Sequence, residues 1–162
     1  MRRCYPATPR RTVIAHSIFA PCFELHGAPK PNNVIMVCVR TGTLAIGDVH
    51  GCGEELAELL ARCDRWYPEG RLIFVGDLFT KGPNPGLVAR LIRERRDHGQ
   101  RIDLVCGNHD LRLRDAIRRR AEGAHLDTLP ETEAQTLKLL ERADMLRPAT
   151  DLTLEACGRV EI

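Results

Sequence analysis

Aromatic side chains and long apolar runs are the features that this 162-residue sequence has least of. Aromatic residues account for only 4% of it, so we expect a core built from Leu, Val, Ile and Ala. No apolar run approaches the roughly 20 residues of a membrane-spanning helix, which argues against a membrane protein. Internal repeats, low-complexity tracts and the phosphate-loop pattern G-x-x-x-x-G-K-[ST] are missing as well, so neither a solenoid nor a P-loop protein is indicated. The remaining composition, 43% hydrophobic and 28% charged, fits one globular cytoplasmic domain.

Closely spaced cysteine pairs are also lacking. The seven cysteines include no C-x-x-C pattern, whereas disulfide frameworks and zinc knuckles show closer and more regular spacing. We therefore interpret them as free, buried thiols in a reducing cytoplasm. They are Cys4, Cys22, Cys38, Cys52, Cys63, Cys106 and Cys157.

Three short segments that combine glycine with hard metal ligands carry the chemistry of the sequence. They read GDVHG at residues 47–51, GDLFTKGP at 76–83 and GNHD at 107–110. Each follows a short apolar run rich in β-branched residues, which is typical of a buried strand. The three runs are residues 43–46, 72–75 and 102–106.

Helical patterns separate these strands and determine how we expect them to pair. Glu54–Trp66 and Asn84–His98 both place leucines at helical spacing, with Pro85 near the start of the second helix and Gly99 just after its end. The order β-α-β-α-β predicts an α/β fold with parallel strands. In such sheets ligands bind beyond the carboxyl ends of the strands, which is where all three segments would lie.

Two Asp, two His and one Asn would then converge on one small volume. Neighbouring carboxylates repel each other unless a cation lies between them, so the convergence of Asp48 and Asp77 indicates a bound metal. Carboxylate and amide oxygens with imidazole suit Mn, Fe, Zn or Mg. Two such metals, roughly 3.5–4 Å apart with a bridging hydroxide as nucleophile, form the usual clamp for phosphoryl displacement. Phosphoester hydrolysis is therefore the favoured chemistry.

In this order and spacing the three segments resemble the calcineurin-like metallophosphoesterases, and within them the phosphoprotein-phosphatase branch with its signatures GDxHG, GDxxDRGP and GNHE. The resemblance covers residues 43–162. It implies the βαβαβ core of a sheet sandwich flanked by helices, incomplete at the C-terminus. It also implies two divalent metal ions, for which we favour Mn and keep Fe, Zn, Co and Mg as alternatives. By position, Asp48 and His50 would bind the first metal, Asp77 would bridge both, and Asn108 would bind the second metal and the phosphate.

The resemblance also implies which residues act on the substrate. His109 would protonate the leaving oxygen, and Lys81 would bind phosphate as a point charge. Position 80 is Thr, where the protein phosphatases place an Asp that orients the general-acid His. The bacterial symmetrical diadenosine-tetraphosphate hydrolases lack that Asp too, so we favour a nucleoside polyphosphate as substrate. A serine/threonine protein phosphatase is the alternative, and neither nucleic acid nor a membrane is expected as a partner.

Family members complete the second metal site with two further His on strands after the helical section. In this sequence no His follows His125. We therefore expect the chain to be a fragment of a longer enzyme. If it were whole, we would expect weak or no hydrolysis, as in a non-catalytic metal-binding or nucleotide-binding remnant. The oligomeric state stays open.

The first 42 residues differ from the rest, since six basic residues against one acidic residue give them a charge of +5. We interpret residues 1–42 as a basic extension, either disordered or upstream of a true start at Met36, which opens directly into a strand-like stretch. A targeting segment is the weaker alternative. At the other end, Pro130–Met145 is predicted to form an amphipathic helix.

Overall fold

The computed structural model describes residues 13–17, 35–40 and 42–158 of the chain. These residues form one five-stranded sheet in the order β1-β2-β3-β4-β5. β3, β4 and β5 pair in parallel as the sequence predicts, whereas β2 pairs antiparallel with β3 and parallel with β1. The strands are β1 Val13–Ser17, β2 Ile35–Arg40, β3 Thr43–Ile46, β4 Arg71–Val75 and β5 Ile102–Val105.

Part of the predicted extension therefore belongs to the sheet. β2 contains the strand predicted to open at Met36, and Gly42, with φ +74°, precedes β3. The predictions of a disordered or targeting segment concern mainly residues 1–12 and 18–34, which lie outside the described residues.

Five α-helices follow or connect the strands. α2 begins as predicted, because Pro85 occupies its first turn and the Asn84 side chain accepts a hydrogen bond from the Leu87 N–H at 3.1 Å. Gly99, with φ +85°, follows its last residues. The helices are α1 Gly53–Trp66, α2 Pro85–Asp97, α3 Asn108–Ala121, α4 Glu131–Arg142 and α5 Leu146–Ala156, with a short 3-10 helix at Leu126–Thr128.

The helix predicted over residues 130–145 is shorter than expected. α4 ends at Arg142, and Asp144 adopts the left-handed backbone conformation with φ +54°, so the chain turns before α5 begins. α5 was not predicted from the sequence. Its signal was the spacing of the apolar residues Leu146, Ala149 and Leu152, together with Pro148, which the first turn of a helix tolerates.

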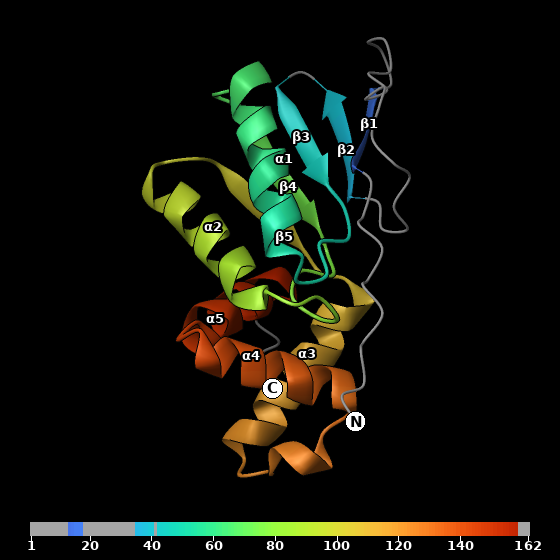
Figure 1. Cartoon of the computed structure of the whole chain (residues 1–162), viewed down its shortest axis with the longest axis vertical. Helices are drawn as coiled ribbons and strands as arrows, with labels where there is room; N and C mark the ends of the chain where they lie inside the picture. The colour runs from blue at the N-terminus through green and yellow to red at the C-terminus, as the bar shows by residue number, and fades with distance from the viewer. Residues whose placement is uncertain (1–12, 18–34, 41, 159–162) are drawn as a thin grey trace, which may run out of the picture.

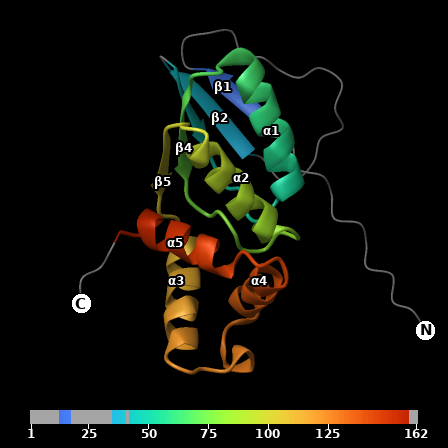
Figure 2. The same cartoon turned by 90° about the vertical axis from the view of Figure 1, so that its left-hand side faces the viewer.

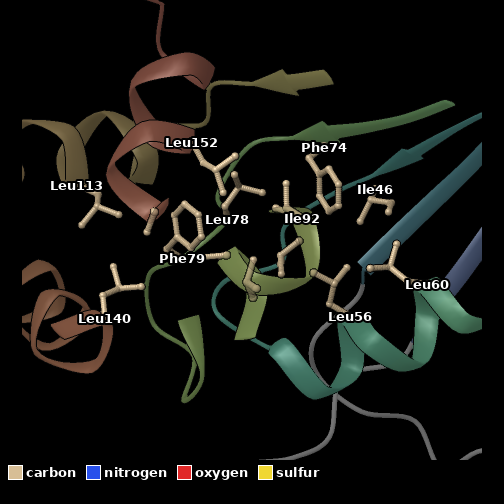
Figure 3. Packing of buried hydrophobic residues seen from close by; sticks show 14 of the residues in the cluster. Ile46, Leu56, Leu60, Phe74, Leu78, Phe79, Ile92, Leu113, Leu140 and Leu152 are labelled. Carbon is tan, nitrogen blue, oxygen red and sulfur yellow. The ribbon is translucent and has the colours of Figure 1, made fainter. Parts of the chain in front are cut away.

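The elements form two regions that share one core. α1 and α2 cover one face of the sheet, while α3, α4 and α5 pack together beyond the carboxyl ends of the strands (Figures 1 and 2). Figure 3 shows the core running without a break from Ile46, Leu56 and Phe74, beside the sheet, to Leu113 and Leu140 in the helical region. The helical region therefore rests against the loops that carry the three motifs.

The two faces of the sheet differ in burial. On the helix-covered face, the residues of β3 and β4 are buried and those of β5 are half-buried. β4 alternates between buried and more exposed positions, as a half-covered strand does. On the opposite face, Val75 and Val105 are 48% and 46% exposed. The described residues thus contribute one sheet of the predicted sandwich. Among them, no helix is long and apolar enough to cross a membrane.

Candidate metal centre

The three motif loops leave the sheet at the same edge, because β3, β4 and β5 are parallel. The first and second loops are joined directly by their backbones. The His50 N–H donates to the Asp77 carbonyl at 2.7 Å, and the Gly51 N–H donates to the Leu78 carbonyl at 2.8 Å. Leu78 and Phe79 are completely buried beneath them, so the second loop is anchored in the core while Asp77 remains at the site.

Glycine is required in the motifs because the loops touch each other. A Cβ atom on Gly107 would lie 2.2 Å from Asp77 Oδ1, and one on Gly82 would lie 2.0 Å from the His50 carbonyl oxygen. Gly76 combines a φ of +89° with a position against the Gly107 backbone. The glycines therefore allow close contact between loops, which the sequence analysis had not considered.

Three of the predicted metal ligands meet at this edge. One ligand atom from each of Asp48, His50 and Asp77 lies within 4.8 Å of the others. His50 Nε2 is 3.9 Å from Asp48 Oδ2 and 3.7 Å from Asp77 Oδ2. His50 and Asp77 are buried, whereas the Asp48 side chain is 63% exposed, so the cluster is open to solvent on one side.

Three residues of the first two motif loops have an uncommon backbone conformation. His50, Asp77 and Lys81 have φ values of +49°, +52° and +72°, in the left-handed region that non-glycine residues rarely occupy. Such positions cost energy and cluster at functional sites, where the surrounding contacts hold them. Here the hydrogen bonds between the first two loops supply those contacts.

Two of the residues predicted to act on the substrate, His109 and Lys81, lie beside the cluster. The His109 ring packs edge-on against the His50 ring, with centroids 5.3 Å apart, and the His109 backbone N–H donates to Asp77 Oδ1 at 2.9 Å. Lys81 Nζ lies 3.5 Å from His50 Nε2. Asn108 is the first residue of α3, next to His109, and its side chain is exposed. Thr80 is buried, and its hydroxyl, like His109 Nδ1, has no hydrogen-bond partner among the described residues.

The model of the calcineurin-like phosphoesterase family matches residues 42–154, which is most of the chain and includes all three motifs. The chain belongs to this family. Two curated relatives are symmetrical bis(5'-nucleosyl)-tetraphosphatases. The one from Janthinobacterium sp. (strain Marseille) is 44% identical over 71 residues, which cover 44% of this chain and 25% of the relative. The one from Hamiltonella defensa subsp. Acyrthosiphon pisum is 34% identical over 115 residues, which cover 67% of this chain and 40% of the relative.

The chain therefore spans less than half the length of these relatives. The part it shares with the phosphoesterase family contains the three motifs, which confirms the resemblance drawn from the sequence.

The donor set fits the divalent metal that the phosphoesterase family implies. Two carboxylates and an imidazole converge within reach of one ion, and their oxygen and nitrogen atoms suit Mn, Fe, Zn or Mg. Without a cation, the carboxylates of Asp48 and Asp77 would oppose each other's charge at this distance.

Asp110 has a structural role in the site that was not predicted from the sequence. Its carboxylate is 1% exposed and accepts backbone N–H bonds from Asp77 at 2.7 Å, Leu78 at 3.0 Å and Gly107 at 3.0 Å. Burial raises the pKa of this carboxyl, and the three N–H donors oppose that shift. Asp110 thus ties the second motif loop to the start of α3. The sequence could have indicated this role, because an acid at the third position of a helix is typical of N-terminal capping.

Proposed function

We propose that this chain carries the metal-binding part of a metal-dependent phosphohydrolase that cleaves phosphoanhydride bonds in dinucleoside polyphosphates. The observation that carries the proposal is the convergence of Asp48, His50 and Asp77 at the carboxyl edge of a parallel sheet. The names of the relatives from Janthinobacterium and Hamiltonella, symmetrical bis(5'-nucleosyl)-tetraphosphatase, support this substrate class over a phosphoprotein. Thr80 favours the same choice, since a protein phosphatase would place an Asp there.

In this proposal Asp48, His50, Asp77 and Asn108 hold divalent metal, with Mn²⁺ preferred. Bound metal would polarise the phosphoryl oxygen and supply an activated nucleophile. The exposed Asn108 also opens α3, and the N-terminal end of a helix favours a phosphate group. A reducing cytoplasm is the location we propose, since such a compartment keeps the cysteines as thiols.

Two further residues act on the substrate itself. His109 would hold a proton for the leaving oxygen, and its contact with the His50 ring places it beside the cluster. Lys81 would neutralise charge on the phosphate, and its ammonium group already lies within 3.5 Å of His50.

The proposal is tested by hydrolysis of three substrates in the presence of Mn²⁺: diadenosine tetraphosphate, p-nitrophenyl phosphate and a phosphopeptide. We expect turnover to be fastest with diadenosine tetraphosphate, and fastest turnover of the phosphopeptide would instead identify a protein phosphatase. Stoichiometric Mn²⁺ binding without turnover of any substrate would overturn the enzymatic proposal for this chain.

The assignment of the site has a separate test. Asp77→Asn removes the central carboxylate, so we expect at least a tenfold loss of Mn²⁺ affinity in isothermal titration calorimetry. Glu141→Gln is the matched control, because it removes one exposed acid of α4 that lies outside the motif loops. Equal Mn²⁺ affinity of the Asp77→Asn and Glu141→Gln variants would mean that the metal binds elsewhere.

A further inference from the structure

A pair of thiols lies directly behind the third motif. Cys106 follows the last residue of β5 and precedes Gly107, and Cys157 follows the last residue of α5. The two residues are 51 positions apart in the sequence, yet their Sγ atoms are 2.7 Å apart. α5 contacts both β5 and α3, so the packing of whole elements brings the sulfurs together.

This contact is close to what a covalent bond requires. A disulfide has an S–S length of about 2.05 Å, so the sulfurs need to approach by well under 1 Å. Both side chains are half-buried, which leaves a route for a small reagent. By contrast, Cys52, in the turn before α1, and Cys63, within α1, are buried.

We propose that Cys106 and Cys157 form a reversible disulfide that fastens α5 to the start of the third metal-binding motif. A reducing cytoplasm keeps both cysteines as thiols, so the bond forms under oxidising conditions, with a small-molecule disulfide such as oxidised glutathione as the oxidant. One cysteine sulfur displaces a glutathione thiol and forms a mixed disulfide, and the second cysteine sulfur then displaces the other glutathione thiol. The two cysteines lose two electrons and two protons, and the oxidant takes up both and leaves as two thiols.

The surroundings of Cys157 slow its reaction with a disulfide, because the thiolate is the attacking form and burial disfavours it. Burial, followed by the hydrogen-bonded Cys106 thiol, raises the pKa of Cys157 to about 12, and the nearby Asp110 carboxylate adds to this effect. Cys157 therefore stays protonated at neutral pH. Asp110 is the residue that joins the second motif loop to α3, so the proposed bond would brace the same junction.

The bond would act mainly on the unfolded chain. Closing the loop between Cys106 and Cys157 lowers the conformational entropy of the unfolded state, and loops of this length give a sizeable effect. We expect the oxidised protein to melt at least about 5 °C above the reduced protein. Neither metal nor substrate enters this expectation, so it can fail or hold independently of the proposed hydrolase function.

The test is a peptide map of the full chain after equilibration with oxidised glutathione and capture of free thiols with N-ethylmaleimide. Trypsin releases Cys106 in peptide 102–112 and Cys157 in peptide 143–159, since the bond before Pro148 resists cleavage. We expect a linked species containing both peptides, which dithiothreitol separates, together with the higher melting temperature. Cys106→Ser and Cys157→Ser should each lose the linkage and the stabilisation, whereas the control Cys63→Ser should keep both.

Three results would overturn the proposal, and all are read on the wild-type chain, so none depends on a variant folding. The first is that glutathione caps each cysteine without linking the peptides. The second is that both thiols remain labelled by N-ethylmaleimide after oxidation. The third is a linked chain with an unchanged or lower melting temperature, which would mean that the bond strains the fold.

Discussion

The buried carboxylate of Asp110 accepts hydrogen bonds from backbone N–H groups of two loops. At the scale of single residues, this gives a prediction for the stability of the protein. Asp110→Ala leaves the N–H groups of Asp77, Leu78 and Gly107 without their acceptor in a buried place. Because hydrogen bonds to a charged group contribute more than neutral ones, we expect a loss of about 3 kcal/mol in the free energy of unfolding. Urea denaturation measures it.

Two controls separate this effect from a general sensitivity of α3. Asp110→Asn keeps one acceptor oxygen, so its loss should be smaller than that of the alanine variant. Asp115→Ala removes an exposed acid from the same helix and should change stability by less than about 0.5 kcal/mol. Equal effects at positions 110 and 115 would contradict the clamping role.

Gly107 gives a second prediction at the residue scale. Its φ of −97° suits any residue, so Gly107→Ala costs nothing in backbone conformation. The added Cβ would nevertheless meet Asp77 Oδ1 at 2.2 Å and the Asp77 backbone nitrogen at 2.6 Å. We therefore expect Asp77 to shift and Mn²⁺ affinity to fall at least tenfold in calorimetry.

Gly123→Ala is the control for that experiment, because it strains the backbone without creating a steric contact. Gly123 has a φ of +96° and no neighbouring atom within 4 Å of an added Cβ. Its substitution should cost about 1 kcal/mol of stability through backbone strain and leave metal affinity unchanged. If Gly107→Ala bound Mn²⁺ as tightly as Gly123→Ala, the contact between the loops would not position Asp77.

At the scale of elements, local sequence patterns predicted the strands and helices that have strong signals. β3, β4 and α2 were predicted to within one or two residues, because β-branched runs, Pro85 and Gly99 mark them locally. The boundary between α4 and α5 was missed, since it depends on one left-handed residue, Asp144, that carries no distinctive local pattern. The Cys106–Cys157 contact was missed for a related reason, because only tertiary packing brings α5 to β5.

The packing of α1 supplies a prediction for pH dependence. Burial raises the pKa of Cys63, on the inner face of α1, from 9.0 to about 11. The folded state therefore holds a proton more tightly than the unfolded state. The stabilisation from this thiol is complete below pH 9 and is lost as pH rises through about 11. Over this range we expect the wild-type protein to lose roughly 2–3 kcal/mol more in unfolding free energy than Cys63→Ala.

Urea titrations at intervals between pH 8 and 11 would measure this difference. Cys63→Ala also leaves a small cavity, which lowers stability by the same amount at every pH and so does not affect the slope. Parallel pH profiles of the wild-type protein and the variant would show that the thiol is not desolvated in solution.

At the scale of the whole molecule, the sequence predicted which side chains converge at the site better than it predicted the contacts that support them. Asp48, His50 and Asp77 could be assigned because parallel strands bring their carboxyl ends to one edge. The clamping role of Asp110 and the interlocking glycines could not, because both depend on how three loops contact one another in space. The convergence of these three side chains therefore follows from the topology, and their precise placement follows from contacts between loops.

Metal binding should consequently stabilise the entire fold, because the proposed ligands come from loops that join the sheet to the helical region. A ligand that binds only the folded state at 100 times its Kd adds about 2.7 kcal/mol to the free energy of unfolding. For a domain of this size we expect Mn²⁺ to raise the melting temperature by roughly 8 °C, and EDTA to reverse it. The shift should vanish in Asp77→Asn and persist in Glu141→Gln, measured by differential scanning calorimetry in dithiothreitol so that the cysteines stay reduced. An equal shift in both variants would show that Mn²⁺ stabilises the protein from a site other than the three motifs.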